Sequence, residues 1–203
     1  MKASSFLITG NDLVGKTTLI NQLVPYLNSL GLKTISNKND LYKTSVMHTI
    51  QSLLDDANNT KDFIQINSLF LVTFLIDSIK YKPDPNVILI QDSYACRTIA
   101  FCYANQLNPI TELLDAYKDH FFPFDVTIHL KASIECRKDR LNAKLNSNNQ
   151  DQLIITDQEK VRKMDQYLND IVKTRKYFLQ VDTSSLTISQ VFEQVKVYVN
   201  NFI

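Results

Sequence analysis

Glycine is scarce in this chain, with only 3 glycines among 203 residues, whereas proteins use roughly 7% on average. No Pro/Gly/Ser-rich stretch divides the sequence, so a flexible linker between two domains is not expected. The length suits one α/β domain with a complete hydrophobic core. We therefore expect a single domain over residues 1–203.

An excess of charge of one sign is also missing, because 22 Lys and Arg residues are balanced by 21 Asp and Glu residues. Without a basic or aromatic cluster, neither a nucleic acid nor an anionic membrane surface is an expected partner. No apolar run approaches the roughly 18 residues of a membrane span, and the apolar run near the start is too short for a signal sequence. We therefore expect a cytoplasmic protein.

Cysteine is rare and odd in number, and its spacing does not suit a zinc site. This pattern favours reduced, buried thiols over a disulfide framework. The thiols concerned are Cys96, Cys102 and Cys136. The scattered histidines have no expected function, and they are His48, His120 and His129.

Two of the three glycines mark a phosphate-binding P-loop. Residues 10–17 read GNDLVGKT, which fits the pattern G-x-x-x-x-G-K-[ST] with Gly10 and Gly15 at its fixed positions. Gly31 follows an expected helix and would end it in a left-handed conformation. The alternative is an ordinary turn before an amphipathic helix, and the scarcity of glycine elsewhere argues against it.

The P-loop has the strand–loop–helix context that its chemistry needs. An apolar run at residues 3–9 precedes it, and leucines at helical spacing follow it. In such a loop the backbone N–H groups and the helix N-terminus surround a triphosphate, Lys16 reaches the β- and γ-phosphates, and Thr17 can hold Mg²⁺. The residues expected to bind the phosphoryl donor are Gly10, Asn11, Asp12, Leu13, Val14, Gly15, Lys16, Thr17 and Thr18.

Strands and helices are expected to alternate along the rest of the chain. The further expected strands cover residues 32–36, 87–92, 125–130 and 177–182. The further expected helices cover residues 44–56, 63–81, 93–106, 113–120, 133–145, 157–176 and 188–202. Residues 37–43 are expected as a polar loop, and residues 146–152 as a mobile loop within a lid at about 144–157. The alternation predicts an α/β fold with a five-stranded parallel sheet between helices.

The expected strand at residues 87–92 ends in a second chemical signal, Asp92. A carboxylate that ends an apolar strand beside a P-loop strand commonly lies near Mg²⁺ or the attacking oxygen. Capping of the following helix is the alternative, and either Asp92 or Ser93 could fill that role. Since ligands bind at the carboxyl ends of parallel strands, Asp92 and the P-loop are expected at the same edge.

Three cations share one face of the expected helix at residues 133–145. Arg137, Arg140 and Lys144 lie at positions i, i+3 and i+7. One interpretation is a solvated face, and the other is a face turned to a nucleotide under the lid.

Taken together, five stretches resemble the thymidylate kinase family of P-loop nucleoside monophosphate kinases, with partial likeness to the related deoxynucleoside kinases. FLITGNDLVGKTT is similar to the family's F-x-G-x-D-x-x-G-K-[ST]-T, and VILIQDSYACRTIAF to its V-[IV]-x-D-R-Y-x-x-S-x-x-A-[FY]. Three further stretches resemble segments of the family: NSLFLVTFLIDSI, PFDVTIHLKASIECRKDRL and VDTSSLTISQVFEQV. All five stretches occur in the family's order along the chain.

The resemblance implies a three-layer P-loop kinase fold, ATP with Mg²⁺ as the donor, and a nucleotide acceptor between the P-loop and the apolar helix. Asp12 would hold the acceptor's sugar hydroxyl, Phe70 would stack on its pyrimidine base, and Arg140 would pack against the donor's adenine. Asp92 would lie near the transferred phosphate and, with Thr17, near Mg²⁺. Family members pair through apolar helices, so a homodimer is also implied.

This chain departs from the family where arginines hold the acceptor, because Tyr42, Phe74 and Ser93 stand at those positions. Each charge-assisted hydrogen bond to a phosphate is worth roughly 1.5–3 kcal/mol, so other cations must compensate. Candidate cations are Lys38, Lys43 and Arg97. The residues expected to contact the acceptor are Asp12, Lys38, Phe70, Phe74, Asp92 and Arg97.

The family also carries a catalytic arginine either in the P-loop or in the lid. Leu13 and Val14 exclude the P-loop position. The remaining candidates are Arg137, Lys144 and Arg162. The expected catalytic set is Lys16, Asp92, Asp12 and Arg137.

Three functional hypotheses follow. The leading one is transfer of the γ-phosphoryl of ATP to a pyrimidine deoxynucleoside monophosphate, most simply dTMP. The second is a deoxynucleoside kinase, in which Asp92 acts as base toward a free hydroxyl and no phosphate-binding arginines are needed. The third is a nucleotide-binding regulator, which the depleted acceptor site favours and the intact set of Lys16, Thr17, Asp12 and Asp92 opposes.

Overall fold

The computed structural model describes residues 2–38, 40–42, 52–53, 62–143 and 149–203. Its sheet consists of β1 (Ser5–Thr9), β2 (Thr34–Lys38), β3 (Ile88–Asp92), β4 (Val126–Lys131) and β5 (Phe178–Asp182). The helices are α1 (Lys16–Ser29), α3 (Phe63–Lys80), α4 (Ala95–Ala104), α5 (Asn108–Tyr117), α6 (Ile134–Asn142), α7 (Asn149–Thr156), α8 (Gln158–Lys173) and α9 (Ile188–Val199), with a 3₁₀ turn η1 (Lys118–His120).

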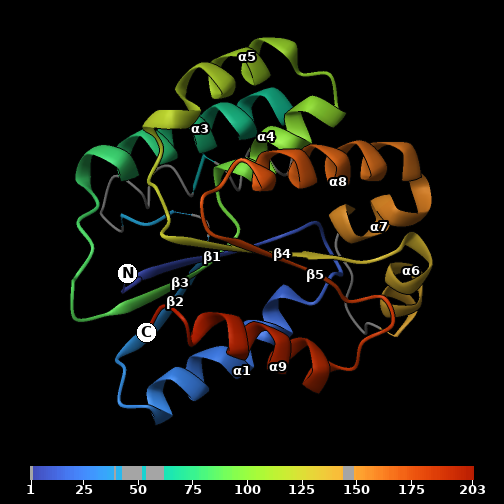
Figure 1. The fold of residues 1–203 in the computed structure, drawn as a ribbon. Coiled ribbons are helices and arrows are strands. Elements are labelled where there is room, and N and C mark those ends of the chain that lie inside the picture. The colour runs from blue at the N-terminus through green and yellow to red at the C-terminus, as the bar shows by residue number, and fades with distance from the viewer. Residues whose placement is uncertain (1, 39, 43–51, 54–61, 144–148) are drawn as a thin grey trace.

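All strand pairs are parallel, and the strand order is β2-β3-β1-β4-β5. α1 and α9 cover one face of the sheet, and α3, α4, α5 and α8 cover the other (Figure 1). The predicted three-layer α/β fold with a five-stranded parallel sheet is therefore confirmed.

Both faces of the sheet are covered, which explains the continuous apolar character of its central strands. Every residue of β1 and of β3 is buried. On one face Leu23 of α1 and Val195 of α9 are fully buried, and on the other Phe74 of α3 and Ile99 of α4 are almost fully buried. Burial of side chains of this size is worth about 1.5–3 kcal/mol each.

The register of the sheet gathers polar groups at its carboxyl edge. Ile8 pairs with Asp92, and Lys38 at the end of β2 also pairs with Asp92. The P-loop follows β1 directly, between Thr9 and Lys16. The ends of β1, β2 and β3 therefore place the P-loop, Asp92 and Lys38 around one point.

Several helix ends lie one to three residues from the predicted ones, and two further boundaries differ for a clear physical reason. β2 covers residues 34–38 instead of 32–36, because Asn37 and Lys38 pair with β3 although their polar side chains suggest a loop. α5 begins at Asn108 instead of Leu113, with Pro109 in its first turn, where a fixed φ favours helix initiation. Of the expected helix at residues 44–56, only 52–53 lie within the described residues, and both are helical.

The prediction of a mobile loop at residues 146–152 is wrong for 149–152, which begin α7. The polar composition of this stretch suggested a loop, but one apolar side chain anchors the helix. Ile154 is 1% exposed and forms a small core with Leu141 of α6 and Val161 of α8, against which Leu13 of the P-loop packs. Residues 144–148 lie outside the described residues.

The thiols are free, as predicted, and Cys96 and Cys102 are buried. Cys136 is only partly buried, contrary to the prediction. Among the described helices α3 is the one that could cross a membrane by length and composition, a weak criterion that a core helix also meets. Here α3 buries Phe74 and Asp77 within the domain.

Candidate active site

The P-loop adopts a conformation that needs glycine at its first position. Gly10 has φ 141°, and a Cβ atom there would lie 2.2 Å from the carbonyl oxygen of Leu130 in β4. Only glycine allows the loop to approach β4 this closely. Gly15 and Leu13 also have positive φ angles, of 99° and 65°. The loop therefore holds several residues in left-handed conformations, which is typical of a functional backbone cradle.

The side chain of Lys16 closes this loop. Its Nζ donates to the carbonyl oxygens of Gly10, at 3.0 Å, and of Asn11, at 2.8 Å. Burial, followed by the nearby charge of Arg97, lowers the pKa of Lys16 to about 8. An anion bound in the loop would favour the protonated form of Lys16 and raise this pKa again.

The P-loop opens into a cavity of about 700 Å³. At one end the cavity wall comes from the P-loop and from Arg140, Thr183 and Leu186. At the other end it comes from α3 and from the residues that follow β3. The cavity therefore joins the P-loop to a second compartment beside α3.

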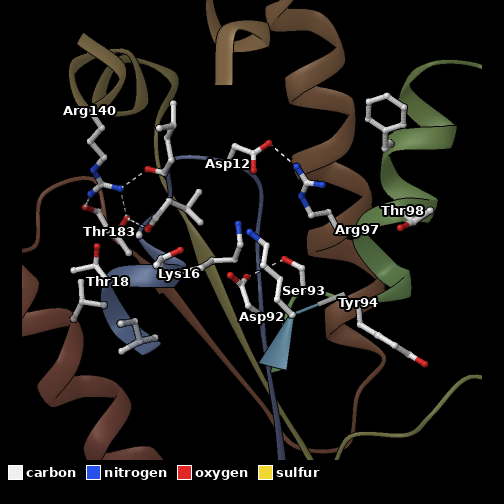
Figure 2. A pocket seen from close by; sticks show the side chains of 18 of the residues that line it. Asp12, Lys16, Thr18, Asp92, Ser93, Tyr94, Arg97, Thr98, Arg140 and Thr183 are labelled. Carbon is white, nitrogen blue, oxygen red and sulfur yellow. Dashed lines mark hydrogen bonds and ion pairs between the residues drawn. The ribbon is translucent and has the colours of Figure 1, made fainter. Parts of the chain in front are cut away.

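Asp12 and Arg97 face each other across the cavity (Figure 2). Nη2 of Arg97 donates to Oδ2 of Asp12 at 2.5 Å, and the two side chains are 19% and 26% exposed. Burial alone would raise the pKa of Asp12, but the charges of Arg97 and Lys16 outweigh it and lower that pKa overall. Asp12 is therefore ionised and held by a cation from α4.

Asp92 lies at the end of β3, 7% exposed, on the cavity wall. Its charge acts on Lys16, beside which Figure 2 shows it. Ser93 has φ 60°, and its Oγ donates to Oδ1 of Asp92 at 3.2 Å. Tyr94 is the N-cap of α4, and the described residues provide no side-chain cap there. Helix capping by Asp92 or Ser93, the alternative role, is therefore wrong.

A short chain of amides supports the backbone at Ser93. Nδ2 of Asn37 donates to Oε1 of Gln91 at 2.9 Å, and Nε2 of Gln91 donates to the carbonyl oxygen of Ser93 at 2.9 Å. The N–H of Ser93 donates to the carbonyl oxygen of Ile8 at 2.9 Å. These bonds hold a left-handed residue in place between Asp92 and α4.

Arg140 connects the P-loop to the loop after β5. Its guanidinium donates to the carbonyl oxygen of Leu13 at 2.8 Å, to Oγ1 of Thr183 at 3.0 Å and to the carbonyl oxygen of Thr183 at 2.7 Å. Thr183 in turn donates to the carbonyl oxygen of Val14 at 3.0 Å. Arg140 also lines the cavity, so its guanidinium connects two loops at the cavity wall.

Arg137 is placed differently from Arg140, although both are on α6. It is 2% exposed, and its Nη1 donates to Asp165 of α8 at 2.8 Å. Arg137 is not among the described residues that line the cavity, but its charge contributes to lowering the pKa of Asp12. A solvated face is therefore wrong for these two arginines, while a catalytic role of Arg137 stays a prediction. Lys144 lies outside the described residues.

The second compartment has an aromatic wall. Phe70 and Phe74 of α3 are stacked, with ring centroids 6.0 Å apart, and Phe74 contacts the ring of Tyr94 at 4.7 Å. All three rings line the cavity, and Lys38 contributes a cation at its rim. Phe74, at the position where the resemblance implies an arginine, is thus part of an apolar surface. Tyr42 is not one of the described lining residues.

Asp77 is a buried carboxylate that the sequence did not reveal as important. It is 0% exposed and accepts hydrogen bonds from the N–H of Leu41 at 3.0 Å, the N–H of Tyr42 at 2.8 Å and the hydroxyl of Tyr94 at 3.1 Å. Burial raises its pKa despite these hydrogen bonds. Asp77 ties α3 to the loop after β2 and to the start of α4. The only sequence signal was a lone carboxylate in an apolar helix.

The few oxygen donors at the cavity suit Mg²⁺, which needs only one or two protein ligands. The described residues contain no group of three or more His, Cys, Asp or Glu side chains that could hold a metal. Mg²⁺ commonly takes one or two protein oxygens and completes its shell with substrate phosphates and water. Thr17, which follows Lys16 in the chain, and Asp92, which lies beside Lys16 in Figure 2, both line the cavity and supply such oxygens.

Comparison with known proteins identifies the family. The model of the thymidylate kinase family matches residues 8–195, whereas no curated protein gives a significant match to the sequence. Among solved structures, thymidylate kinase from Candida albicans is 17% identical with a TM-score of 0.69, and covers 98% of this chain and 92% of its own.

Two further structures show the same fold. Deoxyadenosine kinase from M. mycoides, with bound dATP, is 16% identical with a TM-score of 0.64, over 97% of this chain and 99% of its own. Thymidylate kinase from Ehrlichia chaffeensis is 17% identical with a TM-score of 0.63, over 98% of this chain and 100% of its own. The family match and the P-loop geometry agree that this chain is a nucleotide kinase, and it belongs to the thymidylate kinase family.

Proposed function

We propose that the protein transfers the γ-phosphoryl group of ATP to dTMP. The observation that carries this proposal is one continuous cavity that runs from the P-loop to an aromatic compartment, with Lys16 and Asp92 between them. Phosphoryl transfer needs positioning and neutralisation of charge more than covalent catalysis, and both ends of this cavity are built for positioning.

At the donor end, the P-loop N–H groups and the N-terminus of α1 hold the phosphates of ATP. Lys16 exchanges its two carbonyl partners for the β- and γ-phosphates, since both are stronger acceptors than a backbone oxygen. Arg140 keeps the loop shape and packs against the adenine. Thr17 and Asp92 would hold Mg²⁺, which would supply neutralisation of the phosphate charge.

At the acceptor end, Phe70 stacks on the pyrimidine and Phe74 extends the apolar wall behind it. Asp12 accepts a hydrogen bond from the sugar hydroxyl. Arg97 and Lys38 face the acceptor's phosphate and replace the cations that the family places elsewhere. Asp92 orients the reacting groups near Lys16.

A steady-state assay of ADP release tests this function. Purified protein with ATP and Mg²⁺ is given dTMP, other pyrimidine and purine monophosphates, and the corresponding deoxynucleosides. The proposal predicts turnover of dTMP, and loss of that turnover in Lys16→Ala. Turnover of thymidine but of no monophosphate would instead support a deoxynucleoside kinase, which the arginine-free wall at Phe74 favours. ATP binding with no turnover of any acceptor would support a nucleotide-binding regulator.

We also propose that two copies pair through α3. Ile64, Val72 and Ile79 of this helix are 57%, 46% and 66% exposed and share one face, and a second apolar face could cover them. Sedimentation should give a dimer for the wild type and a monomer for Val72→Glu, whereas a monomeric wild type at micromolar concentration contradicts pairing. A cytoplasmic location, without nucleic acid or membrane as partner, stays a prediction.

A further inference from the structure

The Asp12–Arg97 ion pair lies where the two ends of the cavity meet. Asp12 comes from the P-loop and Arg97 from the first turn of α4, 85 residues later in the chain. Both side chains line the cavity and are only partly shielded from solvent. The pair is therefore open to competition from a bound substrate.

The electrostatics of this region favour an added anion. The charge of Arg97 is the second cause, after burial, of the lowered pKa of Lys16, and Lys38 acts in the same direction. Three cations thus converge on this part of the cavity, and two carboxylates, Asp12 and Asp92, face them. A dianionic phosphate between Lys16 and Arg97 would relieve the repulsion between these cations.

Resting on the proposed function, we propose that Arg97 selects acceptors that already carry a phosphate, by exchanging Asp12 for that phosphate. A guanidinium binds a phosphate through two parallel hydrogen bonds, and a phosphate brings more negative charge than a carboxylate. Once Arg97 turns to the phosphate, Asp12 is released to accept a hydrogen bond from the sugar hydroxyl. The two contacts are therefore coupled.

A nucleoside cannot make this exchange. Its 5′-hydroxyl is neutral and gives Arg97 no replacement for Asp12, so the ion pair persists and competes with the sugar contact. Discrimination between dTMP and thymidine then comes from Arg97, which is not at one of the positions where the family carries an arginine. This assigns a role to Arg97 that offsets the apolar substitution at Phe74 and the small side chain at Ser93.

Calorimetric titration of the full chain with dTMP and with thymidine, without ATP, tests the exchange. In Arg97→Gln the Kd of dTMP should rise about 10- to 100-fold, the loss expected for a charge-assisted contact to phosphate. The Kd of thymidine should stay constant or fall, because Asp12 no longer has a competing partner. Arg97→Lys should keep part of the preference for dTMP, because lysine retains the positive charge but cannot make two parallel hydrogen bonds to the phosphate.

Two further variants sharpen the test. Arg175→Ala removes an exposed arginine outside the cavity and should leave both affinities unchanged. Asp12→Asn keeps Arg97 but removes the negative charge that pairs with it, so Arg97 is more readily available to a phosphate. The ratio of the thymidine Kd to the dTMP Kd should therefore increase, whereas in Arg97→Gln it should decrease. Thermal unfolding of each variant checks that it is folded, and Asp12→Asn tests the exchange independently if Arg97→Gln does not fold.

An unchanged Kd ratio in Arg97→Gln or in Asp12→Asn overturns the inference. Because binding needs no turnover, the result separates the inference from the proposed function. A protein that phosphorylates dTMP but keeps its Kd ratio in these variants refutes the exchange alone. A protein that shows the predicted ratios but never phosphorylates dTMP refutes the function and leaves the exchange intact.

Discussion

Gly10→Ala is the substitution whose effect the structure defines most sharply. The added Cβ would lie 2.2 Å from the carbonyl oxygen of Leu130 and 3.0 Å from Cγ2 of Val14. Cβ atoms essentially never approach other atoms below 3.0 Å, so the P-loop or β4 must shift. Both are rigid, because Leu130 is fully buried in a strand paired on both sides.

Two costs contribute to the expected destabilisation. Forcing extra volume into a packed region costs about 1–3 kcal/mol, and holding an L-residue at φ 141° costs a further 1–3 kcal/mol or so. Gly10→Ala should therefore lower the free energy of unfolding by about 2–6 kcal/mol, a large part of the 5–15 kcal/mol or so typical of a domain. The shift also displaces the N–H groups of the loop, so the affinity for an ATP analogue should fall.

Gly31→Ala is the matched control. Gly31 also has a positive φ, 78°, but no atom lies within 4 Å of the added Cβ. Gly31→Ala should lower the free energy of unfolding only by the strain of the positive φ, about 1–3 kcal/mol, and should leave the affinity for the ATP analogue unchanged. Urea unfolding followed by circular dichroism measures both variants. Equal destabilisation by the two substitutions, or unchanged ATP-analogue affinity in Gly10→Ala, would refute the argument from close packing against β4.

Three other predictions concern charges around the cavity. The pKa of Lys16 is lowered to about 8 in the empty site. Because the phosphates bind the protonated lysine, the affinity for an ATP analogue should fall by up to about tenfold per pH unit above pH 8. Calorimetry at pH 7 to 9.5 measures this affinity, and an affinity that does not change with pH contradicts the prediction. Asp77→Ala leaves two N–H groups and a hydroxyl without their acceptor, so the free energy of unfolding should fall by about 1–3 kcal/mol. The KM for dTMP should rise more than the KM for ATP. Equal changes in the two KM values would argue against a positioning role of Asp77. Arg140→Lys keeps the charge but cannot span Leu13 and Thr183, so KM for ATP should rise about tenfold, while an unchanged KM would show that the span is not needed.

The fold could be predicted because its signals are local or periodic. The P-loop is a pattern within eight consecutive residues, and its backbone conformation depends on glycines inside the pattern. The alternation of apolar strands and helices predicts a parallel sheet, and parallel strands bring their carboxyl ends together. Asp92 could therefore be placed beside the P-loop, and the structure has it there.

The side-chain pairings could not be predicted in the same way. Asp12 and Arg97 are 85 residues apart, and the partners of Asp77 are backbone N–H groups 35 and 36 residues away. A carboxylate within a helix gives no sign of which loop it will meet. Only the packing of α3 against the loop after β2 brings Asp77 to its hydrogen-bond partners.

Helical periodicity was informative about α6 but did not decide the roles of its arginines. Arg137 and Arg140 lie one turn apart and were expected to act on one face. In the structure α6 packs beside both the P-loop and α8, so Arg140 meets Leu13 whereas Arg137 meets Asp165. The split depends on tertiary packing, which periodicity does not contain.

The transfer of label from ATP to dTMP tests the central claim most directly. Protein incubated with dTMP, Mg²⁺ and ATP radiolabelled on the γ-phosphate is separated by chromatography, with Lys16→Ala as the parallel control. The account predicts labelled dTDP from the wild type and none from Lys16→Ala. Unlabelled dTMP, recovered from a folded wild-type protein that binds ATP, would contradict it.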